Sequence, residues 1–232
     1  MPSGFLQAYL QRTSPDKIDA GFLAYLAVLT QIARSSPETA ASIVAELADQ
    51  RSNLRLIASE NYSSLATQLA MGNLFTDKYA AGHAMHQFHA ACDNVDAVET
   101  LAAEEACRLS GAEHPYVQPH SGADANLVAF WSVICARVED PALAELGAQD
   151  PAAMSVEQWN EVRRRCFNQR LLGLDYYSGG HLTHSYRHNV WAQIFEAHTY
   201  TVDPSTGLLD YDAMEAQARA VKPLILLAGY GA

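Results

Sequence analysis

The N-terminal part of the chain places its apolar side chains at helical spacing. Between about Ile18 and Gln50, Phe22, Tyr25, Leu26 and Leu29 share one helical face. Ser36-Pro37-Glu38 is a helix-start signal, with proline early and an acidic residue in the first turn. We therefore expect residues 1–55 to form an N-terminal helical arm of the kind that packs on a partner subunit.

The pattern then becomes irregular before a longer helix. Residues 54–71 predict a short strand or turn and a helix that opens near Ser63-Ser64, and residues 77–94 predict a loop. From Val95 to Leu109 the spacing predicts an amphipathic helix with one apolar and one charged face. Its inward side chains are expected to be Val98, Leu101 and Ala102, and its outward ones Glu99, Glu104 and Glu105.

In the second half of the chain, apolar runs alternate with helical patterns. Strands are expected at 116–118, 171–174, 194–202 and 224–228, and helices at 124–136 and 211–221. The charged stretch 138–170 is interpreted as a helical surface insertion. Residues 56–232 are therefore expected to form an α/β domain, with the apolar 224–228 strand buried in a parallel sheet. Ligands bind beyond the carboxyl ends of such strands, and the sequence stops there.

Composition narrows the class of protein. Hydrophobic residues make up 49% of the 232 positions, so disorder is not expected. The formal net charge of −11 argues against a nucleic-acid binder. We find no apolar run long enough to span a membrane and no basic, apolar leader at the N-terminus. The four cysteines form no CxxC pair, so reduced thiols in a cytoplasmic protein are expected.

The strongest local signal is the stretch VQPHSGADAN at 117–126. Small residues follow an apolar run and precede a helix, where exposed backbone N–H groups bind anions. Ser121 adds a hydroxyl donor. The pattern predicts either a phosphate site or an ordinary helix-capping turn.

A second signal is SGGHLTH at 178–184. Its two glycines allow close backbone approach, and a histidine there can stack on a flat ring, shuttle protons, or be purely structural. Metal binding is the rival interpretation, because His83, His86 and His89, and also His181, His184 and His188, recur at short intervals. Since no cysteine or acid completes a ligand pattern, we expect no metal site.

A third signal is the polar cluster Ser59-Glu60-Asn61, which directly follows the apolar run Leu56-Ile57. It predicts either polar groups at the edge of a site or the start of a helix.

Taken together and in order, these segments resemble the serine hydroxymethyltransferase family. The matching stretches are LIASENYSS at 56–64, DKYAAG at 77–82, VQPHSGADAN at 117–126, SGGHLTH at 178–184, VDPSTGLLDYDAME at 202–215 and KPLILLAGY at 222–230. The resemblance implies an incomplete large domain of the aspartate-aminotransferase-like (fold type I) class, which binds pyridoxal 5'-phosphate. It also implies transfer of a one-carbon unit between serine and tetrahydrofolate by a homodimer or tetramer.

The resemblance assigns roles to individual residues. Ser121, Gly122 and Ala123 match the stretch that binds the cofactor phosphate, and His181 matches the residue stacked on the pyridine ring. Tyr79 matches a tyrosine that reaches the cofactor phosphate of the neighbouring subunit.

Further matches concern the substrates. Ser59 matches a residue beside the amino acid, while Tyr176, Gly180 and Leu182 match folate contacts. His184 matches a motif histidine whose role is open, so the catalytic candidates are His181, Ser59 and His184.

The chain also departs from the family pattern. Ala81 stands where the family has a glutamate that transfers protons, a change that typically costs about 10²–10⁴-fold in rate. Phe88-His89 replaces a tyrosine pair, and Gly231 replaces a serine. The lysine that holds the cofactor covalently would lie downstream, since the only lysines are Lys17, Lys78 and Lys222.

Three hypotheses follow. The chain is a truncated glycine hydroxymethyltransferase that is inactive alone, or a degenerate paralogue that pairs with an intact subunit, or a histidine-rich metal binder. Ala81 and the altered loop after it motivate the second hypothesis, because truncation alone would not change them.

Overall fold

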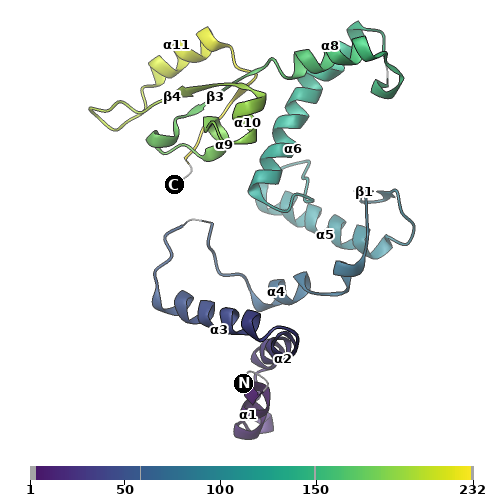
Figure 1. Ribbon diagram of the computed structural model, residues 1–232, viewed down its shortest axis with the longest axis vertical. Coiled ribbons are helices and arrows are strands. Elements are labelled where there is room, and N and C mark those ends of the chain that lie inside the picture. The colour runs from purple at the N-terminus through teal and green to yellow at the C-terminus, as the bar shows by residue number, and fades with distance from the viewer. Residues whose placement is uncertain (1–3, 58, 149, 231–232) are drawn as a thin grey trace. The chain divides into compact units, whose positions relative to one another are not determined.

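The computed structural model describes residues 4–57, 59–148 and 150–230 and divides into two compact units (Figure 1). The first unit extends to Val95 and the second begins at Asp96, inside helix α5 (Asp93–Ser110). The division at Val95 does not test the predicted N-terminal arm, so its boundary after residue 55 stays a prediction.

The first unit is built on helices, α1 (Phe5–Arg12), α2 (Ala20–Ser35), α3 (Pro37–Ser52) and α4 (Leu65–Met71). Leu29 and Ala33 of α2 bury against Ala40 of α3. The Ser36 side chain caps α3 by accepting the Thr39 N–H, and Pro37 occupies the first turn. The two helices and their boundary are therefore confirmed.

The rest of the first unit is mostly loop. The part of 54–64 that the structure describes contains no strand, and the expected helix opens with Ser64 as the cap of α4. Residues 78–92 form a loop, close to the predicted 77–94, and it contains one small antiparallel hairpin, β1 (Gly82–His83) and β2 (His86–Gln87).

Helix α5 extends one or two residues beyond its predicted bounds, but its faces are not those that we expected. Val98 and Leu101, which we placed inward, are 52% and 56% exposed. No element among the described residues covers this face, so helical periodicity identified an apolar stripe without a partner in this chain.

The second unit contains a three-stranded parallel sheet in the order β4-β3-β5. Its strands are β3 (Arg170–Leu174), β4 (Glu196–Tyr200) and β5 (Ile225–Leu226). Helix α11 (Tyr211–Val221) connects β4 to β5, and Leu209, Met214 and Ala218 pack against Leu172, Leu174 and Tyr200 of the sheet. The α/β class is confirmed, as are the strands predicted at 171–174 and 194–202 and the helix predicted at 211–221.

Two strand predictions need correction. Residues 116–118 form no strand, and the prolines at 115 and 119 on either side of them disfavour pairing in a sheet. The predicted buried strand 224–228 is reduced to the edge strand β5, in which Leu226 is 46% exposed.

The segment 138–170 is mostly helical, as expected, and one of its faces is buried, while its assignment as an insertion stays a prediction. Helix α6 (Gly122–Ile134) continues through a π-helical turn at Cys135–Glu139 into α7 (Asp140–Glu145), and α8 (Val156–Cys166) follows. Ala142, Leu143, Val162 and Cys166 are buried with Ile134 and Leu171 in the largest core cluster. Charged residues are interspersed throughout this segment, so the sequence did not reveal its apolar inner face.

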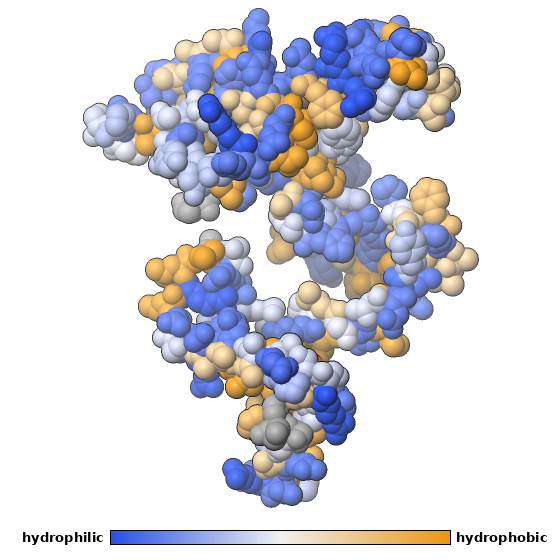
Figure 2. Space-filling model, in the orientation of Figure 1, coloured by the Kyte–Doolittle hydropathy of each residue, from blue (hydrophilic) through white to orange (hydrophobic). Residues whose placement is uncertain are grey.

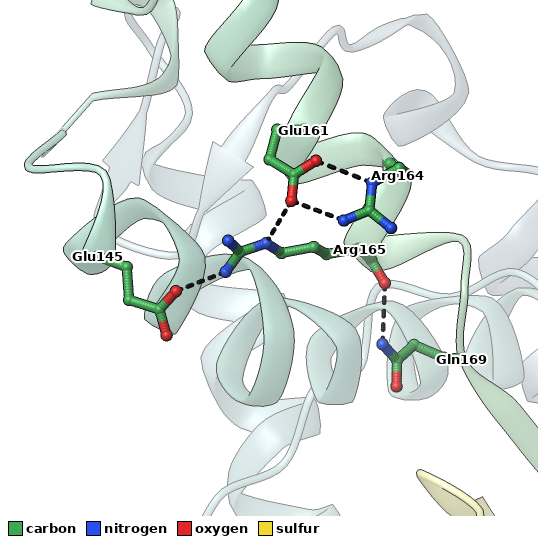
Figure 3. Close-up of polar contacts among 5 residues, drawn as sticks. All are labelled: Glu145, Glu161, Arg164, Arg165 and Gln169. Atoms are coloured by element: carbon green, nitrogen blue, oxygen red, sulfur yellow. Dashed lines mark hydrogen bonds and ion pairs between the residues drawn. The ribbon is translucent and has the colours of Figure 1, made fainter.

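The outer face of this segment carries an ion-pair network (Figure 3). Glu161 accepts two hydrogen bonds from Arg164, at 2.7 and 2.8 Å, and one from Arg165 at 2.9 Å. Arg165 also donates to Glu145 of α7 at 2.6 Å. The network thus ties α8 to α7 on the solvent side while Val162 and Cys166 hold the inner side.

Two short helices complete the second unit, α9 (Leu182–Ser185) and α10 (Val190–Ile194). Trp191 of α10 is buried edge-on against Phe130 of α6, with ring centroids 4.9 Å apart. Helices α6, α9 and α10 are therefore packed around the same end of the sheet's core.

Candidate functional site

The turn at Ser121 begins helix α6. Ser121 is extended, and its hydroxyl oxygen accepts the Asp124 N–H at 3.1 Å while its hydroxyl donates to the Asp124 carboxylate at 3.0 Å. Ser121 is therefore a helix cap, one of the two functions that its sequence pattern predicts.

The exposed backbone N–H groups of the same turn are also suited to binding an anion. The first N–H groups of a helix have no intrahelical acceptor, and here Gly122 and Ala123 supply them on an exposed surface. A Cβ added at Gly122 would meet nothing within 4 Å, so the approach is open. Asp124 is the one acidic group in the first turn, and a phosphate would compete with it for the Ser121 hydroxyl.

His181 lies at the start of α9 and is connected to α6. Its Nδ1 accepts the Thr183 N–H at 3.2 Å and lies 2.7 Å from the Thr183 hydroxyl. Asn126 of α6 donates to the same hydroxyl at 3.3 Å. The Ser121 turn and His181 therefore belong to neighbouring helix starts, joined by one hydrogen-bonded bridge.

The glycine pair before His181 is needed for close packing. Gly179 has a backbone φ of 95°, which residues with a side chain rarely adopt. A Cβ at Gly180 would collide with the Leu174 carbonyl at the end of β3. Because the Gly180 N–H also donates to the Asp175 carbonyl, the loop turns back over the strand end and presents His181 at the edge.

His184 is buried against β3. A Cβ at Gly173 would lie 2.8 Å from the His184 Cβ, which explains a glycine inside an apolar strand. Burial lowers the pKa of His184, although its hydrogen bond to the Leu174 backbone acts in the opposite direction. The His184 Nδ1 is buried without a hydrogen-bond partner in the described structure. This geometry supports a structural role for His184.

Tyr176 borders a cavity of about 500 Å³ next to α9. Its ring lies 5.0 Å from that of Tyr186, and Tyr186 lies 5.3 Å from the His188 ring. Other lining residues are Asp175, Tyr177, Ser185, Arg187, Ala192, Ala197 and Thr199. The other folate candidates differ in exposure, since Gly180 is buried and Leu182 is 43% exposed.

Ser59 and Tyr79 lie in the first unit. Ser59 is exposed in a turn that is braced by the Arg55–Glu60 ion pair at 2.8 Å. The Tyr79 ring is 71% exposed and meets the edge of the His89 ring at 4.8 Å. Both side chains are accessible in the first unit.

The altered loop after Tyr79 is locally ordered. The Ala81 carbonyl accepts the Phe88 N–H at 2.8 Å, which closes the β1–β2 hairpin. Phe88 is exposed, and His89 contacts Tyr79. The alanine therefore lies in a defined hairpin, but it offers no group that transfers a proton.

The histidine triplets do not converge on a metal. Within 4–57, 59–148 and 150–230, no cluster of three histidine, cysteine or acidic side chains has the arrangement of a metal site. His83 and His86 face each other across the hairpin, and His184 is buried away from His188. Among the same residues, no helix is long and apolar enough to cross a membrane.

Comparison with known proteins decides the family. The family model described as serine hydroxymethyltransferase matches residues 32–143 and 164–232. The chain belongs to the serine hydroxymethyltransferase family. It is 56% identical over 232 residues to the serine hydroxymethyltransferase of Treponema pallidum, covering all of this chain and 40% of that protein.

Two further relatives with the same name match this chain at lower sequence identity. The serine hydroxymethyltransferase of Mycolicibacterium smegmatis is 52% identical over 217 residues, which are 94% of this chain and 44% of that protein. The Chlamydia trachomatis protein of the same name is 42% identical over 231 residues, which are 98% of this chain and 46% of that protein. The chain thus spans less than half the length of these relatives.

The family model leaves residues 144–163 unmatched, a shorter segment than the insertion that we predicted. The alignment with the Treponema pallidum relative nevertheless extends over the whole chain. Since Val162 is buried in the largest core cluster, this segment contributes to the packed core of this chain.

Sequence reasoning missed three residues of the site. Asn126 and Thr183 were inside the quoted motifs but had no role, and Gly173 was treated as one position of a strand. A glycine within an apolar strand signals close backbone approach. No sequence signal pairs Asn126 with Thr183, because the bridge depends on how α6 and α9 pack.

Proposed function

We propose that this chain supplies the phosphate-binding and ring-facing part of an enzyme that transfers a one-carbon unit between serine and tetrahydrofolate. The observation that carries the proposal is the hydrogen-bonded bridge from Asn126 to Thr183, which joins the helix start at Ser121 to His181. A helix start that can bind phosphate therefore neighbours an imidazole that can cover a flat ring.

The donor set fits pyridoxal 5'-phosphate. The Ser121 hydroxyl and the N–H groups of Gly122 and Ala123 would hold the phosphate, and His181 would lie against the ring. When bound, the cofactor supplies the electron-withdrawing ring that stabilises a carbanion on the amino acid. Such a binding domain is part of the aspartate-aminotransferase-like architecture, and the parallel sheet around β3 is consistent with it.

The remaining site assignments are part of the same proposal. Ser59 would face the amino acid, and Tyr79 would reach the cofactor phosphate of a neighbouring subunit in a homodimer. Tyr176, Gly180 and Leu182 would contact the folate, and the cavity beside Tyr176 supports this because aromatic rings and polar groups line it together. We also propose that the enzyme acts in the cytoplasm.

The roles of the two motif histidines differ within this proposal. His181 orients the ring and offers an exposed imidazole at the site. His184 holds the α9 start against β3 and does not touch the substrate, because it is buried against Gly173. Ala81 leaves the family's proton-transfer position without an acid or base.

The experiment that tests this function uses the full-length protein that carries these residues. We expect glycine to form from serine only when tetrahydrofolate is present, and Ser121→Ala to weaken the affinity for pyridoxal phosphate. Loss of a hydrogen bond to a charged group costs about 1.5–3 kcal/mol, or about tenfold to a hundredfold in affinity.

The 232-residue chain serves as the comparison in that assay. It is expected to give no lysine adduct with pyridoxal phosphate that borohydride traps, since its lysines are Lys17, Lys78 and Lys222. An adduct would contradict our site. A full-length protein that binds the cofactor but makes no glycine would favour a degenerate paralogue instead.

A further inference from the structure

We propose that Thr183 and Asn126 are positioning residues that hold the His181 imidazole as its neutral tautomer, with the proton on Nε2. The claim concerns three side chains of the second unit, and its consequence for the cofactor rests on the proposed function. The sequence left stacking, proton shuttling and a purely structural role open for His181, and the inference argues against proton shuttling.

The Thr183 backbone provides the first constraint. Its N–H points at the His181 Nδ1 from 3.2 Å, as a helix cap requires. A backbone N–H is always a donor, so Nδ1 must be the acceptor. In a neutral imidazole, the proton is then on Nε2.

The Thr183 hydroxyl provides the second constraint. Its oxygen lies 2.7 Å from the His181 Nδ1, and an acceptor nitrogen at that distance requires the hydroxyl to donate. Asn126 Nδ2 donates to the same oxygen at 3.3 Å, which leaves the hydroxyl hydrogen free to point at the imidazole. All the donors thus point in one direction, from Asn126 through Thr183 to His181.

Burial makes the arrangement specific. Thr183 is only 5% exposed and Asn126 is half-buried, so solvent cannot readily replace either donor. The His181 side chain is exposed, and its Nε2 edge is the part of the ring that is not engaged in capping α9. His181 therefore presents an oriented, uncharged ring with a donor at Nε2, and it does not accept a proton there.

The test is long-range ¹H–¹⁵N correlation spectroscopy on the labelled 232-residue chain, with His181 assigned by its loss in His181→Asn. We expect Nδ1 to resonate as an unprotonated nitrogen and Nε2 as a protonated one. A proton on Nδ1, or equal signals from two exchanging tautomers, would overturn the inference.

Substitutions test which groups act. Thr183→Val removes the hydroxyl and should shift the Nδ1 resonance, whereas Thr183→Ser keeps the hydroxyl and should preserve the resonance. Asn126→Ala should cause a smaller shift in the same direction. If Thr183→Val folds, as judged by its dispersed amide spectrum, and Nδ1 does not shift, the positioning role is wrong.

A different result would refute the proposed function. Pyridoxal phosphate added to the same sample should perturb the His181 ring signals and the Gly122 and Ala123 amides. The absence of that perturbation, with the tautomer as expected, would refute the cofactor site and leave the positioning role intact.

Discussion

Gly180 shows at the scale of one residue how the site depends on close packing. Its backbone lies against the Leu174 carbonyl, where even a methyl group has no room. We expect Gly180→Ala to lower the free energy of unfolding by about 1–3 kcal/mol, the usual cost of overpacking. Denaturant unfolding measures this.

Gly122→Ala is the matched control, because the added Cβ meets open space and alanine favours a helix. Its unfolding free energy should be unchanged or slightly higher. Equal destabilisation by the two substitutions would show that the loop at Gly180 is not packed as described.

Cys166 gives a second prediction at this scale. It is 3% exposed, and burial raises the pKa of its thiol to about 11, so it stays protonated at neutral pH. Among the four cysteines, Cys166 should be alkylated far more slowly than the partly exposed Cys107, as peptide mass spectrometry would show. Equally rapid labelling of both would contradict a buried α8.

At the scale of elements, the stability that helix α8 contributes depends on pH because of Glu161. Hydrogen bonds from Arg164 and then Arg165 lower the pKa of Glu161 from 4.5 to about 2. A lowered pKa means that the stabilisation is complete above the unfolded-state value and is lost as the pH falls towards 2. Unfolding measured between about pH 5 and pH 2 should show this loss.

Glu161→Gln isolates that contribution. The variant should be less stable at neutral pH and should lose less stability than the wild type over the same acid range. Glu104→Gln, at an exposed position of α5, removes one negative charge as well, keeps the network of Figure 3 and serves as the control. Identical pH profiles for Glu161→Gln and the wild type would mean that the network does not stabilise α8.

Sequence alone predicted those elements whose signals are local. The helix start at Ser36-Pro37-Glu38, the strand at 171–174 and the helix at 211–221 depend on short patterns, and all three are confirmed. The sheet partners of residues 116–118 and the covering of Val98 depend on distant packing, so those predictions were wrong.

The candidate site was predictable to a similar extent. Motif order indicated Ser121 and His181, and the structure connects their helix starts. The bridge through Asn126 and Thr183 could not be derived, because it depends on the packing of α6 and α9. The buried inner face of 138–170 was missed because charged side chains are interspersed among the apolar ones along this segment.

For the whole molecule, exposed apolar side chains predict self-association. Figure 2 shows hydrophobic residues on the molecular surface, and large exposed side chains include Leu54, Leu56, Phe88, Leu101 and Leu109. Exposed apolar surface of this kind favours association. Sedimentation of the 232-residue chain should reveal oligomers that increase with concentration.

The apolar face of α5 offers a direct test. The double substitution Val98→Lys and Leu101→Lys should reduce association, whereas Glu104→Lys on the polar face changes the formal charge by the same amount and should not. Association that responds equally to both changes would be due to charge and not to the apolar face.

The central claim is that one site binds phosphate at Ser121 and covers a ring with His181. The most direct measurement compares dissociation constants of the chain for pyridoxal phosphate, pyridoxal and inorganic phosphate. Ser121→Ala should weaken the binding of both phosphate-containing ligands. His181→Asn, which keeps a good helix cap, should weaken the binding of both ring-containing ligands. If neither substitution changes the affinity for pyridoxal phosphate, this account of the site is wrong.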